Sequence, residues 1–285
     1  MLLLILVTLL WAFSFSLIGV YLAGHVDAWF CVLIRIALAV LVFLPFLKPR
    51  KTPVKLAIQL MGIGAIQLGV MYGFYYQSFL FLTVPEVLLF TVMTPVYVTL
   101  VNDLLDRRLN GHFLVCATLA TLGAIAIRYH NVNEGFIWGL LMVQGANLSF
   151  AIGQVAYKRI LSHTGKEISQ QSIFGWFFIG ALIVAVIAFA LLGNIHQLPQ
   201  NAKQWVILIY LGIIASGLGY FAWNKGATQV NVGALAVANN LLIPAGILVN
   251  LLIWNHNANI LRLSIGGVMI VAALYVNQLW AKHHK

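Results

Sequence analysis

Residues 2–22 read LLLILVTLLWAFSFSLIGVYL and contain no charged side chain. At 1.5 Å per residue, a helix of this length crosses the roughly 30 Å hydrocarbon core of a bilayer. No lysine or arginine precedes the stretch, and it continues past Trp11 to about Tyr21, unlike the basic start and short apolar core of a cleaved signal peptide. It therefore predicts a first membrane-spanning helix that is retained.

The rest of the chain has the same character. Of its 285 residues, 62% are hydrophobic and 8% are charged, against about 45–50% and about 25% in soluble domains. Apolar runs bounded by proline, glycine, charged or amide residues predict ten spans, near residues 2–22, 29–47, 56–80, 85–102, 111–129, 135–157, 172–192, 203–222, 232–253 and 261–280. We expect an all-α integral membrane protein.

The net charge of +10 would suggest a nucleic-acid partner in a soluble protein. Here the basic residues lie in short connections between apolar runs, so we expect no nucleic-acid partner. If the amino terminus is cytoplasmic, the opposite side holds only Arg128, Lys203 and Arg262, and Arg35 lies within a span. The cytoplasmic side then holds Lys48, Arg50, Lys51, Lys55, Arg107, Arg108, Lys158, Arg159, Lys166, Lys225, Lys282 and Lys285. The positive-inside rule predicts that both termini are cytoplasmic.

The ten spans divide into two related halves, residues 1–130 and 131–285. Short matches link them: SerPhe at 14–15 and 149–150, GlyValMetTyr at 69–72 and GlyLeuGlyTyr at 217–220, and the prolines Pro95 and Pro244. Because each half has an odd number of spans, the two five-helix repeats should be inverted relative to each other. We expect a substrate site near the midplane, with Pro95 and Pro244 as hinges between the halves.

Several strings resemble the EamA-type carriers of the drug/metabolite transporter superfamily over essentially the whole chain. They are TrpAlaPheSer at 11–14, Arg35 in the second span, ThrPro at 94–95 and AspArgArgLeu at 106–109. Further strings, at 10–16, 88–92, 150–153, 157–159 and 227–230, are similar to the enterobacterial biotin-carrying branch of the carboxylate/amino acid/amine transporter subgroup. The family's usual acidic residue after span nine is replaced here by Asn255-His256.

The resemblance implies a secondary transporter in the bacterial inner membrane that takes up biotin by alternating access. Its partners would be a small-molecule substrate, either biotin or another small carboxylate or amino acid, and the lipid bilayer. It implies no cofactor and no protein partner. The alternative is an exporter of amino acids, amines or other small metabolites or drugs on the same fold, because the spacing of residues along the sequence does not indicate the direction of transport.

Other classes of protein find little support. The chain has no HExxH, GxSxG or GxxxxGK motif, so neither an enzyme nor an ATP-driven pump is expected. Cys31 and Cys116 lie inside apolar spans without metal-ligand spacing, and we expect no metal site. A channel is disfavoured because no filter signature repeats along the chain.

Charged residues within spans are functional candidates, because burying a charge in the bilayer costs about 2.5–3.5 kcal/mol on insertion scales. Arg35 is either a structural charge that pairs with neighbouring helices or a residue that couples transport. Glu86 follows Pro85 at the start of a span and is either a helix cap or a proton-coupling carboxylate. Lys158 and Lys225 end spans, where they either anchor the interface or pair with a substrate carboxylate.

Uncharged polar residues also occur inside the spans: Gln67, Tyr72, Tyr75, Tyr76, Gln77, Asn147, Gln154, Asn224, Asn239, Asn240 and Asn250. Hydrogen bonds between helices explain many such residues. The adjacent pair Asn239-Asn240 covers about 100° of one helix, so at least one of the two amides should face a cavity or a partner. Deep aromatic residues could cover a flat heterocycle. We therefore expect substrate contacts from Trp11, Tyr72, Tyr76, Gln77, Asn147, Trp223, Asn224, Asn239 and Asn240, with Tyr220 nearby.

Overall fold

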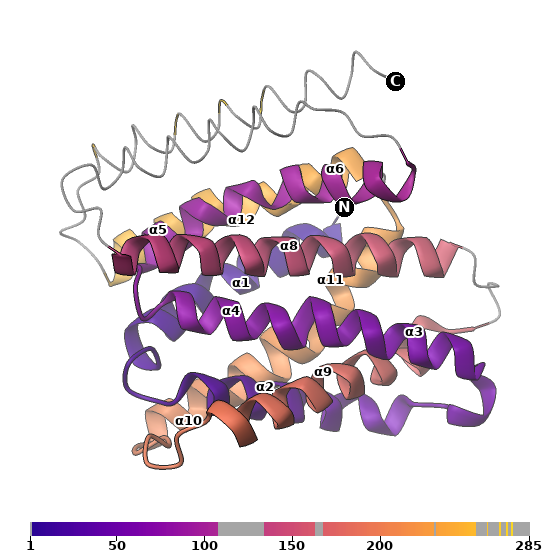
Figure 1. Ribbon diagram of the computed structural model, residues 1–285, viewed down its shortest axis with the longest axis horizontal. Coiled ribbons are helices and arrows are strands. Elements are labelled where there is room, and N and C mark those ends of the chain that lie inside the picture. The colour runs from indigo at the N-terminus through magenta and orange to yellow at the C-terminus, as the bar shows by residue number, and fades with distance from the viewer. Residues whose placement is uncertain are drawn as a thin grey trace.

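The computed structural model of the protein describes residues 2–107, 134–162, 168–230 and 232–254, with single positions at 261, 268, 272 and 275. Regular structure in these ranges is entirely helical, and the helices run side by side along the long axis of a bundle (Figure 1). The α-helices are α1 (Leu2–Tyr21), α2 (Ala28–Phe43), α3 (Val54–Gly64), α4 (Met71–Ser78), α5 (Val84–Phe90), α6 (Thr94–Leu105), α8 (Glu134–Ser162), α9 (Gln170–Leu192), α10 (Ala202–Ile209), α11 (Gly219–Thr228) and α12 (Val232–Ile253).

Within the described ranges, seven helical stretches are long and apolar enough to cross a membrane: Leu2–Tyr21, Ala28–Phe46, Val54–Ser78, Val84–Leu105, Glu134–Ser162, Gln170–Leu192 and Ala202–Thr228. Each matches a predicted span. Helix α12 covers the predicted ninth span and contains a shorter apolar segment, Ala238–Ile253. The predicted spans at 111–129 and 261–280 lie almost entirely outside the described residues. The all-helical, multi-span class is thus confirmed.

Three of the long stretches change helix type in their interior, and Ala28–Phe46 ends in a 3-10 turn, Leu44–Phe46. The third and eighth predicted spans contain π-helical segments, η3 (Ala65–Val70) and η5 (Tyr210–Leu218), and a short 3-10 turn, η4 (Thr91–Met93), separates α5 from α6. Pro95 stands in the first turn of α6, where its missing N–H is tolerated. Pro244 lies inside α12 and removes a hydrogen bond from that helix. These irregular segments lie within spans, where neighbouring helices can support them.

Side chains at the helix starts explain where several helices begin. Asp27 caps α2, because its Oδ1 accepts a hydrogen bond of 2.7 Å from the backbone N–H of Phe30. Asn201 caps α10 in the same way, with an Oδ1 to Gln204 N distance of 2.9 Å. These caps occupy the donors that the first turn of a helix leaves unsatisfied.

Glycine allows α3 and α9 to pack backbone against backbone. A Cβ atom on Gly64 would lie 1.8 Å from the carbonyl oxygen of Phe177, and one on Gly180 would lie 1.9 Å from that of Met61. No side chain fits at either position without moving a backbone. Such close approach is the usual means by which membrane helices associate, since lipid supplies no hydrophobic force between them.

Buried and exposed surfaces are both apolar. Aromatic rings such as Phe174, Phe177 and Phe178 are fully buried, whereas Leu191 and Leu252 are more than 60% exposed on the outside of the bundle. This distribution suits a protein whose outer surface contacts lipid. Some of the buried polar side chains, among them Arg35, Asn147 and Asn239, line a cavity inside the bundle.

Candidate functional site

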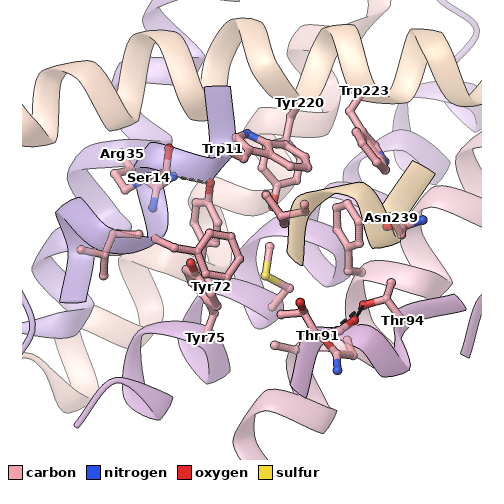
Figure 2. Close-up of a pocket in the computed structure, with 17 residues that line it drawn as sticks. Trp11, Ser14, Arg35, Tyr72, Tyr75, Thr91, Thr94, Tyr220, Trp223 and Asn239 are labelled. Carbon is pink, nitrogen blue, oxygen red and sulfur yellow. Dashed lines mark hydrogen bonds between the residues drawn. The ribbon is translucent and has the colours of Figure 1, made fainter. Parts of the chain in front are cut away.

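A cavity lies at the middle of the bundle, with about 700 Å³ of empty space that includes its opening to solvent. Its lining comes from the central turns of several helices, and Figure 2 shows these side chains converging: Trp11, Ser14, Phe15, Ile18, Arg35, Met71, Tyr72, Tyr75, Thr91, Thr94, Ala146, Asn147, Phe150, Tyr220, Trp223, Asn239 and Leu242. Residues from both predicted halves of the chain contribute.

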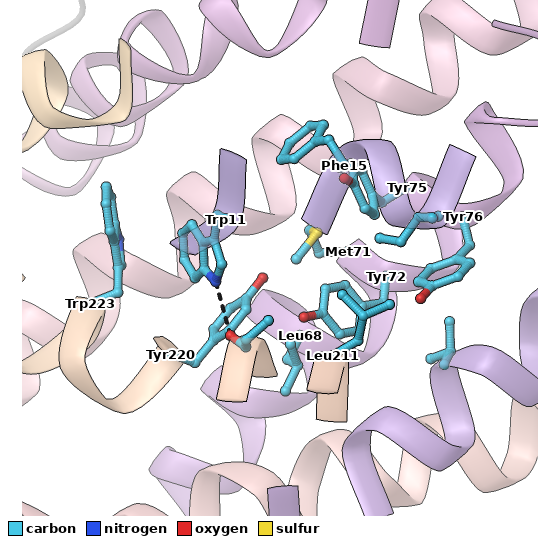
Figure 3. Close-up of a cluster of buried hydrophobic side chains, with 14 of the residues drawn as sticks. Trp11, Phe15, Leu68, Met71, Tyr72, Tyr75, Tyr76, Leu211, Tyr220 and Trp223 are labelled. Carbon is cyan, nitrogen blue, oxygen red and sulfur yellow. Dashed lines mark hydrogen bonds between the residues drawn. The ribbon is translucent and has the colours of Figure 1, made fainter. Parts of the chain in front are cut away.

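Aromatic rings form one wall of this cavity. The ring of Trp11 lies 5.0 Å from that of Tyr220 and 5.1 Å from that of Trp223, measured between centroids, and Phe150 lies 6.0 Å from each of the three. Figure 3 shows Trp11, Tyr220 and Trp223 close together, with Tyr72, Tyr75 and Tyr76 further along. Such a wall offers flat apolar faces to a ring-shaped ligand.

The π-helical segments position two of these aromatic residues. Tyr72 follows η3 by two residues, and Tyr220 follows η5 by two residues. Their rings lie 5.8 Å apart in an edge-to-face arrangement. A π segment inserts a wider turn, rotates the residues that follow it, and is frequent at functional sites. The two segments therefore set which face of each span points into the cavity.

Arg35 lies at one end of the cavity and is 2% exposed. Its Nη2 donates a hydrogen bond of 2.6 Å to the hydroxyl of Tyr72, its Nη1 one of 3.0 Å to that of Tyr76, and its Nε one of 3.1 Å to Ser216 Oγ. The guanidinium carbon also lies 4.3 Å from the centroid of the Tyr72 ring. Arg35 thus links α2 to α4 and to η5, which supports the structural part of its predicted role.

Amides and hydroxyls lie on the other side of the cavity, away from Arg35 (Figure 2). Asn147 Nδ2 donates a hydrogen bond of 2.8 Å to the carbonyl oxygen of Phe90, and its Oδ1 accepts one of 3.2 Å from Thr94 Oγ1. Asn239 Nδ2 donates to the carbonyl oxygen of Leu235 at 2.8 Å. Both amide side chains are buried and held in place, so they present a fixed polar surface to the cavity.

The structure separates the predicted pair Asn239-Asn240. Asn239 lines the cavity, whereas Asn240 does not, and Asn240 Oδ1 is buried without a hydrogen-bond partner in the part of the chain that the structure describes. Asn224 is fully buried and accepts a hydrogen bond of 3.2 Å from Gln67 Nε2. Tyr76 contacts Arg35, and Gln77 is half-buried near the end of α4. That Asn239, Asn240, Asn224, Tyr76 and Gln77 bind substrate directly stays a prediction.

The two predicted lysines do not line the cavity. Lys158 Nζ donates a hydrogen bond of 3.0 Å to the carbonyl oxygen of Ala227 and a second one to that of Val230. These carbonyls lie at the carboxyl end of α11, where a cation satisfies acceptors and complements the helix dipole. Lys225 Nζ lies 5.7 Å from the centroid of the Phe221 ring. The contacts of Lys158 are those of a helix cap.

Glu86 forms a capping box at the start of α5. Its Oε2 accepts hydrogen bonds of 2.8 Å from both the backbone N–H and the hydroxyl of Thr83. The carboxylate is buried and is not among the residues that line the cavity. This geometry is that of the helix cap considered above, while coupling through Glu86 stays a prediction.

Several lining residues were not singled out from the sequence as site residues: Ser14, Phe15, Ile18, Met71, Thr91, Thr94, Ala146, Phe150 and Leu242. Thr91 and Thr94 are three residues apart and so share a helix face, which is the signal that could have found them. The Thr91 hydroxyl donates a hydrogen bond of 2.6 Å to the carbonyl oxygen of Leu88, and the Thr94 hydroxyl donates one of 2.7 Å to that of Thr91. Threonine in a helix does this commonly, so residue type alone does not mark a site.

Comparisons with known proteins agree with this architecture. The model of the EamA-like transporter family matches residues 1–129 and 137–278. A biotin transporter from Escherichia coli (strain K12) is 50% identical over 281 residues, which are 98% of this chain and 93% of that protein. A probable biotin transporter from Pseudomonas aeruginosa is 52% identical over 276 residues, 97% of this chain and 96% of that protein.

Among solved structures, one crystal structure superposes with a TM-score of 0.67 at 16% identity, covering 99% of this chain and 98% of that chain. At this identity the likeness concerns the fold alone. The family match covers most of the sequence, and it is a family of transporters, not enzymes. The chain therefore belongs to the EamA-like transporter family.

Proposed function

We propose that this protein takes up biotin across the bacterial inner membrane as a secondary transporter. The observation that carries the proposal is the central cavity with an aromatic wall and fixed amides, in a chain about half identical to biotin transporters over nearly its full length. Biotin has a fused bicycle with a ureido group, an aliphatic tail and a carboxylate. The cavity offers contacts that suit the ring system and its ureido group.

The ring system fits between the aromatic wall and the amide side. Trp11, Trp223 and Tyr220 would cover the apolar faces of the bicycle. The ureido group has two N–H donors, which the side-chain oxygens of Asn147 and Asn239 can accept, whereas the Nδ2 donors of both amides are bonded within the protein. A ligand of this kind should lose affinity when one of the two asparagines is replaced by an apolar residue, because the ureido group that it paired with would remain buried without a hydrogen bond.

We propose that transport proceeds by rocking of two inverted five-helix repeats, residues 1–130 and 131–285, around this cavity. The separate family matches at residues 1–129 and 137–278 support two repeats of similar length. The π segments η3 and η5 add a structural parallel, because each precedes a tyrosine that lines the cavity. Inverted repeats with a site between them are the architecture of many secondary transporters.

We propose further that both termini are cytoplasmic, on the strength of the excess of lysine and arginine in the connections on that side. A cysteine-accessibility experiment tests this orientation. Single cysteines introduced at Lys51 and at Gln200, in loops predicted on opposite sides, should differ in labelling by a membrane-impermeant maleimide added to intact cells. Labelling of the Lys51 position and protection of the Gln200 position would reverse the assignment.

Uptake tests the function itself. A biotin auxotroph that lacks its own carrier should grow at low external biotin when it expresses this chain, and should accumulate tritiated biotin. An exporter on the same fold would not rescue growth. Expression without rescue and without uptake would reject the biotin assignment and leave the family assignment unchanged.

A further inference from the structure

Arg35 carries a buried charge whose partners are neutral. Within the described part of the chain, its hydrogen bonds go to the hydroxyls of Tyr72, Tyr76 and Ser216, and no described carboxylate forms an ion pair with it. A guanidinium at this depth in a membrane protein is expensive unless it is paired or functional. The cavity that it lines is the place from which a negative charge could compensate it.

The surroundings of Arg35 are suited to receiving an anion. A guanidinium has five N–H donors, of which the three hydrogen bonds described account for three. Tyr72 and Ser216 are themselves joined by a hydrogen bond of 2.8 Å, which uses one of their two hydroxyl hydrogens; when Ser216 is the donor, the hydrogen of Tyr72 can turn toward an incoming acceptor. A carboxylate at this end would accept charge-assisted hydrogen bonds from arginine and a neutral one from a hydroxyl.

The other cations predicted to meet a substrate are engaged elsewhere. Lys158 donates to the carbonyl oxygens of Ala227 and Val230, and Lys225 lies over the ring of Phe221. Neither lysine is among the residues that line the cavity, whereas Arg35 is. In the part of the chain that the structure describes, the charge available to a ligand in this cavity is therefore that of Arg35.

We propose that Arg35, with the hydroxyl of Tyr72, binds the carboxylate of the transported molecule, and that the cavity selects organic monocarboxylates. The inference rests on the proposed function and adds an orientation to it. The carboxylate lies at the Arg35 end, and the ureido ring lies between the aromatic wall and Asn239 (Figure 2). Arginine is well suited to this role because its planar fork matches a carboxylate with two parallel hydrogen bonds.

Titration calorimetry on the purified, detergent-solubilised protein tests the inference with two ligands, biotin and biotinol, in which a CH₂OH group replaces the carboxylate. The wild type should bind biotin roughly 30-fold or more tightly than biotinol, a factor that corresponds to about 2 kcal/mol for a charge-assisted pair. In Arg35→Gln, the affinity for biotin should fall to that for biotinol, and the affinity for biotinol should change little. The matched control, Lys55→Gln, removes an exposed cation far from the cavity and should keep the full preference for biotin.

The loss of preference between the two ligands is the decisive readout, because a purely structural role of Arg35 would weaken both alike. Equal weakening of biotin and biotinol in Arg35→Gln overturns the inference, as does equal affinity for the two ligands in the wild type. If Arg35→Gln does not fold, Arg35→Lys replaces it. That variant retains the charge but loses the fork, and it should show a reduced preference for biotin; an unchanged preference would contradict the role given to the guanidinium.

A panel of other small organic monocarboxylates, each with its alcohol analogue, separates this inference from the proposed function. The protein could bind one of these acids and not biotin, and prefer the acid to its alcohol analogue in the wild type but not in Arg35→Gln. This result would reject biotin as the substrate and uphold the carboxylate site. Binding of biotin with no dependence on its carboxylate would uphold the substrate and reject the site. Binding of no acid in the panel and no biotin would reject both.

Discussion

The indole Nε1 of Trp11 donates a hydrogen bond of 2.9 Å to the backbone carbonyl oxygen of Ala215. The two residues are 204 positions apart in the chain, and the bond joins α1 to the π segment η5 (Figure 3). The carbonyl belongs to a segment whose hydrogen bonding departs from that of an α-helix, so the indole helps to satisfy the irregular backbone. Trp11 is thus both part of the aromatic wall and a support for the segment that carries Tyr220.

Replacing Trp11 should separate these two roles. Trp11→Phe keeps an aromatic ring but removes the hydrogen bond, and we expect biotin to bind about 2- to 10-fold more weakly, as the net worth of one hydrogen bond implies. Trp11→Ala removes the wall as well and should weaken binding more than about 10-fold. Calorimetric titration measures both. The control is Trp138→Phe, at a tryptophan that is 58% exposed, which should leave binding unchanged; equal affinity of Trp11→Ala and wild type would remove Trp11 from the site.

Lys158 should matter for stability and not for recognition of the carboxylate. Lys158→Met removes the donors to the carbonyl oxygens of Ala227 and Val230 at the end of α11, and we expect a loss of about 1–3 kcal/mol of stability. The thermal unfolding midpoint, followed by tryptophan fluorescence, should fall, while the preference for biotin over biotinol persists. A variant with wild-type stability and no such preference would show instead that Lys158 reaches the substrate.

Two glycines of α3 that are two residues apart, and so lie on different faces of the helix, give a matched test of the packing between α3 and α9. Gly64→Ala places a methyl group 1.8 Å from the carbonyl oxygen of Phe177, so the helices must separate, and we expect a destabilisation of about 1–3 kcal/mol. Gly62→Ala meets nothing within 4 Å and should be neutral or stabilising by up to about 1 kcal/mol, because alanine favours the helix. Unfolding midpoints of the two purified variants decide the matter, and equal midpoints would argue against the close approach.

Glu86→Gln distinguishes the helix cap from a proton-coupling carboxylate. A glutamine oxygen can still accept the hydrogen bonds from Thr83, so the capping box and the fold should survive. We expect uptake to persist with the same dependence on external pH as in the wild type. The measurement is the initial rate of tritiated biotin uptake between pH 5.5 and 8, and a flattened pH profile in this variant would assign coupling to Glu86.

The prolines Pro95 and Pro244 are predicted hinges and lie at the start of α6 and inside α12. In the double variant Pro95→Ala, Pro244→Ala, α12 regains the hydrogen bond that Pro244 removes, and the junction between η4 and α6 regains a backbone N–H at residue 95, which should stiffen both places. We expect slower initial uptake with an unchanged dissociation constant for biotin, because the motion is affected and the cavity is not. Normal initial rates in the double variant would dismiss the hinges.

The sequence predicted the spans well because membrane insertion depends on local composition. The stretches around residues 2–22 and 172–192 are apolar throughout, and no distant contact is needed to make them helical in a bilayer. The same local reading found Arg35, Trp11 and Asn239 as polar or aromatic residues in the interior of spans. Such residues are few enough in an apolar chain to stand out.

Which of these residues share the cavity was beyond a local reading. Asn239 and Asn240 are neighbours that differ by about 100° around one helix, and only the packing of α12 on α1 and α6 decides that Asn239 faces inward. The π segments η3 and η5 rotate Tyr72 and Tyr220 relative to a regular helix. A sequence analysis that assumes 3.6 residues per turn does not predict these π segments.

By itself, then, the sequence determined that this chain is a helical membrane protein of a transporter family, because hydrophobic length and family strings are properties of contiguous residues. The tertiary structure alone decided that Arg35 lines the cavity and that Lys158 caps a helix. Both are cations on membrane-spanning helices, and their roles differ because Arg35 meets hydroxyls beside an open space while Lys158 meets backbone carbonyls. The partners of a long side chain come from other helices, whose rotation and depth follow from the packing of the whole bundle.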